Sequence, residues 1–106
     1  MTAQLNDAGE QTSIPVEELL QTRGNRYGTF KNQAALSQAL KNTIMKHYFN
    51  TRENPAPMEP YMAEAIAMIC HKLARIVNGD PYYESSWVDI EGYAKLVSDE
   101  LKGVSN

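Results

Sequence analysis

The sequence predicts a small all-α bundle of about four helices. Apolar residues recur at helical spacing in long stretches, Pro and Gly separate these stretches, and nothing alternates like a strand with comparable strength. At 106 residues the chain is long enough for one core and too short for two. We expect a disordered polar tail over residues 1–12 and a single helical domain over residues 13–106. Because such a core is modest, a homodimer or a higher homo-oligomer is expected to complete it.

The first helix is expected in "SIPVEELLQTRG", with Ser13 as its N-cap and Gly24 as its stop. The stretch "RGNRYGTF", residues 23–30, is then a connector between helices. Thr29 is placed to cap a second helix from Lys31 to Phe49. That helix repeats an apolar residue every four positions, at Leu36, Leu40, Ile44 and Tyr48.

The Pro-rich stretch "NTRENPAPMEP" ends the second helix. A third helix follows, from Glu59 or Tyr61 to Val77, and "NGDP" stops it. Its apolar residues form one stripe: Met62, Ile66, Ile69, Leu73, Ile76 and Val77. The last helix is expected from about Ser86 to Lys102, with Ser86 and Asp89 spaced as a capping box. It is expected to bury Trp87, Ile90, Ala94, Val97 and Leu101.

Charge is segregated along the chain, although the net charge is only −3. Residues 23–52 hold six basic residues and no acid, whereas residues 80–100 hold six acids and one lysine. This pattern fits an anionic ligand beside the basic segment, or attraction between two halves of the fold. Nucleic-acid binding is disfavoured, since a duplex binder usually carries a basic excess.

The basic connector is the main candidate for a binding site. Its glycines let a ligand approach the backbone, and Arg23 and Arg26 have the donor geometry for phosphate oxygens. Tyr27 and Phe30 offer rings that stack on a base or pack against the bundle. The N-terminus of the second helix adds amide donors at the same place.

A second cluster comes from the third and fourth helices. Lys72 and Arg75 lie within one turn of each other, and the short link makes Asp89 their neighbour. One interpretation is an Arg75–Asp89 ion pair. The other is that Lys72 and Arg75 bind phosphates, or that Glu64 and Asp89 hold a metal ion.

No apolar run reaches the roughly 18 residues of a membrane span, and the N-terminus does not look like a signal peptide. We therefore expect a cytoplasmic protein that is not bound to a membrane. The single cysteine, Cys70, lies among apolar residues, which is typical of a buried side chain.

The segments "RGNRYGTF" and "KLARIVNGDPYYESSWVDIEGYAKLV" resemble a family of small phage- or prophage-encoded helical proteins of unassigned function. The shared pattern is R-x-x-x-YG, then K-[IL]-AR, then D-S-x-x-D-[IV]-x-GY-A, and the resemblance covers roughly residues 17–101. Here Glu84 and Ser85 precede Ser86 where the family often has Asp-Ser. Related phage families are linked to nucleotide modification or nucleotide pools. Such proteins act in the cytoplasm of the host cell.

A more distant resemblance is to the all-α nucleoside triphosphate pyrophosphohydrolases of the MazG and dimeric dUTPase type. These enzymes hold Mg²⁺ with E-E-x-x-E on one helix and E-x-x-D on a later one, and "SWVDIEGYA" is similar to the second motif with Asp89 at the aspartate. Ser86 replaces the first glutamate of that motif, and Glu64 stands alone on the third helix. The resemblance therefore implies a metal site that has been lost or is supplied differently.

Three functions follow in order of preference. The first is binding of a nucleotide or another phosphorylated small molecule without robust hydrolysis, through Arg23, Arg26, Tyr27, Lys72 and Arg75. The second is a small dimeric interaction protein that docks on a host or phage protein. The third is a degenerate pyrophosphohydrolase, which would need Mg²⁺. No residue is assigned as catalytic, and an enzyme is the less favoured interpretation.

Overall fold

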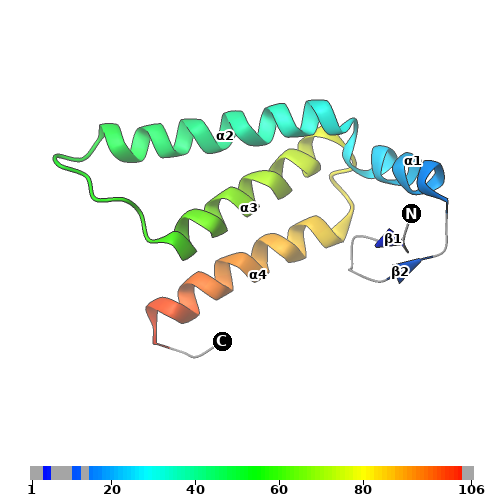
Figure 1. The fold of residues 1–106 in the computed structure, drawn as a ribbon. Helices are drawn as coiled ribbons and strands as arrows, with labels where there is room; N and C mark the ends of the chain where they lie inside the picture. The colour runs from blue at the N-terminus through cyan, green and yellow to red at the C-terminus, as the bar shows by residue number, and fades with distance from the viewer. Residues whose placement is uncertain (1–3, 6–10, 13–14, 104–106) are drawn as a thin grey trace.

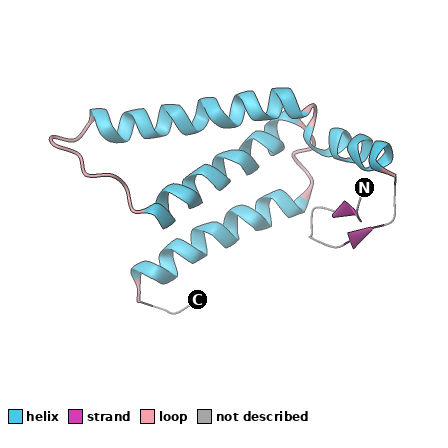
Figure 2. Cartoon of the chain, viewed as in Figure 1, coloured by secondary structure: helices cyan, strands magenta, loops and turns pink. Residues whose placement is uncertain are grey.

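Three long helices lie in one layer, with α3 between α2 and α4 (Figure 1). The computed structural model describes residues 4–5, 11–12 and 15–103 of the chain. Its helices are α1 Val16–Tyr27, α2 Phe30–Asn50, α3 Pro60–Asn78 and α4 Glu84–Leu101. Consecutive long helices run antiparallel, and α1 packs at the end of the layer where α2 begins (Figure 2). The all-α class and the four helices expected from the sequence are confirmed.

The N-terminal region contributes one short pair of strands to the described residues. Strands β1 Gln4–Leu5 and β2 Gln11–Thr12 pair antiparallel, with Gln4 opposite Thr12. The remainder of the tail expected over residues 1–12 lies outside the described residues, as does the expected N-cap Ser13.

Helix α1 continues past Gly24, where its stop was expected, and ends before Gly28. Gly28 has φ +75°, and its N–H donates to the carbonyl oxygen of Gly24 at 2.8 Å. A glycine inside a helix costs only about 1 kcal/mol relative to alanine, so Gly24 need not end it. The turn that redirects the chain needs the positive φ, and Gly28 supplies it. Thr29 caps α2 as expected, because its Oγ1 accepts from the N–H of Asn32 at 3.3 Å.

Helix α4 begins two residues before the expected start at Ser86. Its first residue is Glu84, and the N-cap Tyr83 makes no side-chain capping bond. Ser86 is buried inside the first turn, at 3 % exposure. The expected capping box of Ser86 and Asp89 is therefore wrong, since a capping box requires its serine before the first turn.

The core of the layer consists of small side chains on the two flanks of α3. The buried residues of this helix are Ala65, Cys70, Ala74 and Ile76. A central helix in a single layer meets neighbours on two flanks rather than on one face, so the apolar stripe expected to be buried is only partly covered. Val77 is 67 % exposed, and on α4 Trp87 and Leu101 are 51 % and 64 % exposed.

Helix α2 shows the same departure from its apolar pattern. Gln33 and Ser37 are its buried residues, whereas Ile44 of the expected stripe is 41 % exposed.

Burial of Cys70, at 1 % exposure, agrees with the sequence expectation. Within the described residues, no helix is both long and apolar enough to cross a membrane.

Candidate functional site

Two connectors meet at one end of the layer (Figure 1), and we call residues 26–29 and 78–80 together the corner. The N–H of Asp80 donates to the carbonyl oxygen of Arg26 at 2.5 Å. The side-chain amide of Asn78 donates to the carbonyl oxygens of Tyr27 at 2.7 Å and Thr29 at 3.2 Å. A Cβ on Gly79 would overlap the backbone of the first connector, so the approach depends on this glycine. These contacts fix "RGNRYGTF" against "NGDP".

Tyr27 lies at the centre of the corner and is 5 % exposed. The guanidinium carbons of Arg75 and Arg23 lie 4.1 Å and 5.4 Å from its ring centroid. The ring of Tyr83 meets it edge to face, with centroids 6.0 Å apart. Tyr27 is therefore a packing residue between cations, and its ring is not exposed for stacking on a base.

The other two predicted ligand residues, Arg26 and Lys72, contact Tyr83 and Asp89. The Nη1 atom of Arg26 donates to the hydroxyl of Tyr83 at 3.0 Å, and its guanidinium lies over that ring. The Nζ atom of Lys72 forms an ion pair with Asp89 at 3.0 Å. The sequence suggested Arg75 as the partner of Asp89, and the structure places Lys72 there instead. Among the described residues, the Nε atom of Arg75 is the buried side-chain nitrogen without a hydrogen-bond acceptor.

A half-buried histidine on α3, His71, lies near three cations. The Nδ1 atom of His71 lies 3.0 Å from the amide nitrogen of Gln33, which is buried. Burial lowers the pKa of His71 below its ordinary value, and the positive charges of Arg75, Lys72 and Arg23 lower it further. The neutral ring accepts the bond from Gln33 at Nδ1 when its own proton is on Nε2. Arg23, Lys72 and Arg75 are thus close enough to act on one group.

A hollow of about 400 Å³ opens where α1 ends and α2 begins. Its lining is Leu20, Arg23, Gly24, Tyr27, Gly28, Thr29, Phe30 and Gln33. None of these residues carries a carboxylate, and the first turn of α2 contains no acid. Phe30 is 77 % exposed at the rim. The hollow therefore combines a guanidinium, the positive end of a helix and an accessible aromatic ring.

Two of the predicted ligand residues, Arg23 and Tyr27, line this hollow. Arg75 is near it through its contact with the Tyr27 ring, whereas Arg26 and Lys72 are not among the lining residues. Gln33 is a lining residue that the sequence analysis did not single out. Its position four residues after Thr29, on the same face of the helix, is the signal that could have identified it.

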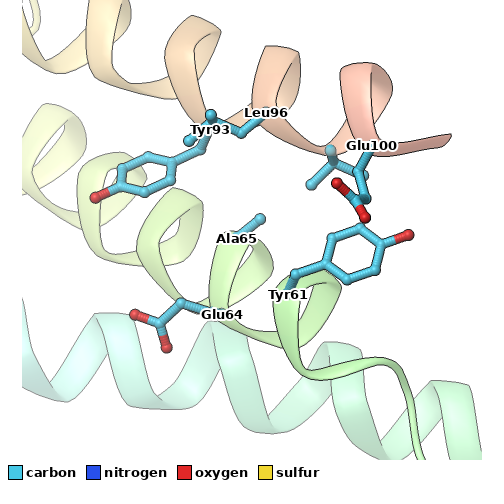
Figure 3. Close-up of a pocket in the computed structure, with 7 residues that line it drawn as sticks. Tyr61, Glu64, Ala65, Tyr93, Leu96 and Glu100 are labelled. Carbon is cyan, nitrogen blue, oxygen red and sulfur yellow. The ribbon is translucent and has the colours of Figure 1, made fainter. Parts of the chain in front are cut away.

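The two predicted carboxylates lie in different places. Asp89 pairs with Lys72, and Glu64 lines a second hollow of about 400 Å³ between α3 and α4. Tyr61, Tyr93 and Glu100 also line that hollow, and the carboxylate of Glu64 is turned away from Glu100 (Figure 3). In the part of the chain that the structure describes, no three His, Cys, Asp or Glu side chains gather as a metal site would require. The structure does not bring Glu64 and Asp89 together on one ion.

Comparisons of the chain with models of protein families, with curated proteins and with solved structures found no match. The resemblance to phage-encoded helical proteins and to pyrophosphohydrolases therefore rests on the quoted residues alone. Any functional conclusion has to come from the geometry of the corner and of the helix faces.

Proposed function

We propose that the hollow at the start of α2 binds a phosphorylated small molecule, with a nucleotide as the best fit. The observation that carries this proposal is the exposed ring of Phe30 beside the N-terminus of α2, in a hollow that Arg23 lines and no described carboxylate enters. The resemblance of the quoted segments to phage proteins linked to nucleotide pools supports the same class of ligand.

Each part of a nucleotide has a matching group in this hollow. The amides of the first turn of α2 and its dipole favour phosphate oxygens. Arg23 can donate two parallel hydrogen bonds to a phosphate. Phe30 offers a face on which a base can stack. The residues around the hollow bind and orient the ligand, and none is placed to activate water.

Arg75 and Lys72 act at longer range. The guanidinium of Arg75 holds the Tyr27 ring that forms one wall, and its charge adds to the positive potential of the corner. Lys72 is largely compensated by Asp89. Because Arg23 lines the hollow and Arg75 does not, we assign phosphate contact to Arg23 and a positioning role to Arg75.

The test is a thermal shift with inorganic pyrophosphate, ADP and ATP. Ligand at 100 times its dissociation constant contributes about 2.7 kcal/mol, which raises the midpoint of a domain this small by roughly 10 °C. Arg23→Gln should abolish the shift for all three ligands. Phe30→Ala should reduce the thermal shift caused by ADP and ATP and leave the shift caused by pyrophosphate unchanged.

Arg52→Gln is the matched control, because Arg52 also lies over a tyrosine ring, 4.0 Å from the centroid of Tyr48, at the other end of α2. It should bind all three ligands as the unaltered chain does. No shift with any of them, or a full shift in Arg23→Gln, would contradict the proposal.

The second candidate function is a small interaction protein that docks on a host or phage protein. The specific observation in its favour is the number of large apolar side chains left exposed, among them Tyr82 and Val88, which lie outside the apolar groove of α3 and α4. The third candidate, Mg²⁺-dependent hydrolysis, predicts pyrophosphate release from a nucleoside triphosphate that is lost in Asp89→Asn. Full release in that variant would exclude Asp89 as its metal ligand.

A further inference from the structure

An apolar groove runs along one face of α3 and α4. Its volume is about 380 Å³, and its lining is Met58, Met62, Ala65, Ile66, Ile69, Ala94, Val97, Ser98 and Leu101. We call the surface formed by these residues, together with Leu73 and Val77 of the same α3 stripe, the open face. No described residue that lines the groove is charged, and Ser98 is its polar member.

The open face is apolar but only partly covered within one chain. Leu101 is 64 % exposed at one end and Val77 is 67 % exposed at the other. Of the α3 residues between them, Ala65 is buried, whereas Met62, Ile66, Ile69 and Leu73 are only half-buried because α2 and α4 cover the flanks of that helix and not this side. A contiguous apolar face of this kind marks an interaction surface in a water-soluble domain.

The accessible surface of the whole chain is larger than that of a compact monomer of the same mass. The chain exposes 7521 Å², whereas a compact monomer of 11.9 kDa exposes about 6,000 Å². The Cα radius of gyration is 16.2 Å, against about 13 Å for a compact chain of this length. The excess of about 1,500 Å² is counted over all 106 residues. Loss of about 1,000 Å² of it from each chain would bury the roughly 2,000 Å² at which the range of obligate homodimers begins.

We infer that the open face is covered by a second copy of this chain, so that α3 and α4 of the two copies form a four-helix core. In a two-fold dimer the same surface of both copies meets, so a charged surface would be placed against the like charges of the other copy. The open face meets this condition because its groove lacks charged residues. The dimer also has two layers of helices, whereas one chain has a single layer.

The experiment measures the mass of the chain in solution by light scattering and by sedimentation. The unaltered chain is expected at twice 11.9 kDa. Leu101→Glu is expected to convert it to the monomer, because dimerisation would bury two carboxylates against an apolar surface. Val77→Glu is a second variant at the other end of the face. Both positions are mostly exposed in the monomer, so helical circular dichroism should be retained.

Leu96→Glu is the matched control. Leu96 is 50 % exposed on α4 and lines the hollow beside Glu64, not the apolar groove. This variant should remain dimeric. A chain that stays monomeric at its highest soluble concentration would overturn the inference, and co-flotation of such a monomer with phosphatidylcholine vesicles would assign the face to lipid instead. Loss of the dimer in Leu96→Glu but not in Leu101→Glu would also overturn it, by moving the interface to the hollow beside Glu64.

Discussion

The two glycines of "RGNRYGTF" should respond in opposite directions to replacement by alanine. Gly28 has φ +75° and ψ −164°, a conformation in which L side chains are strained, and a Cβ there would overlap the backbone and side chain of Asn78. Gly24 lies inside α1, and a Cβ there meets nothing within 4 Å. Gly28→Ala should therefore destabilise the fold, and Gly24→Ala should stabilise it.

The magnitudes follow from the contacts of the corner. Backbone strain at Gly28 costs about 1–3 kcal/mol. Displacing Asn78 removes its two hydrogen bonds, to Tyr27 and Thr29, worth about 0.5–1.5 kcal/mol each. The free energy of unfolding should fall by about 2–6 kcal/mol, a large part of the 5–15 kcal/mol typical of a domain. Gly24→Ala should raise it by about 0.5–1 kcal/mol, the gain of alanine over glycine inside a helix.

Urea unfolding followed by circular dichroism measures both changes. Gly28→Ala should lower the urea midpoint by roughly 1 M or more, and Gly24→Ala should raise it slightly. If Gly28→Ala unfolds at the midpoint of the unaltered chain, the close approach of the two connectors is wrong. If Gly24→Ala is the more damaging change, the helix ends at Gly24 and the turn begins there.

Two further predictions concern charge. Asp89→Asn should lower the free energy of unfolding by about 0.5–1 kcal/mol, because the ion pair with Lys72 is partly open to solvent, and the difference from the unaltered chain should shrink at high salt. A change that is independent of salt would argue against the pair. The pKa of His71 is lowered in the folded state, so the unfolded chain binds more protons near this pKa and stability should fall as the pH drops below about 6.5. Urea unfolding across pH should show this decline flattened in His71→Gln and retained in His47→Gln; the same slope in both variants would contradict it.

The boundaries of the helices were predictable where one local rule decided them. Pro60 begins α3, "NGDP" ends it, and Thr29 caps α2, because each rule acts through the backbone of its own segment. The choice between Gly24 and Gly28 was not predictable, since either glycine can end a helix. Asn78, about fifty residues away, makes its hydrogen bonds at the second of them.

The sequence predicted which apolar residues share a helix face, but not that much of this face stays exposed in a single chain. Periodicity shows which residues share a face, and Met62, Ile66 and Ile69 do share one on α3. It cannot show whether that face meets the rest of the same chain or another molecule. The number of helices in the layer decides this, and with α2 and α4 on the two flanks the face stays open.

The sequence predicted which basic residues lie near one another but not which of them pairs with Asp89. The sequence located the basic residues at one end of the bundle, where Arg23, Lys72 and Arg75 do act together on His71. Whether Lys72 or Arg75 meets Asp89 depends on three residues of helical rotation, about 300°. Spacing within one turn cannot decide this, and the packing of α4 against α3 does.

The two proposals concern opposite sides of α3, and this separates them physically. His71 is two residues from both Ile69 and Leu73, which is about 200° around the helix, and Arg75 is related to Leu73 and Val77 in the same way. A second copy on the open face therefore leaves the cationic side of α3 uncovered, together with the hollow beside Gln33. The monomeric Leu101→Glu chain should still bind phosphate, and Arg23→Gln should still dimerise. Because neither surface contributes a residue to the other, loss of one function leaves the evidence for the other intact.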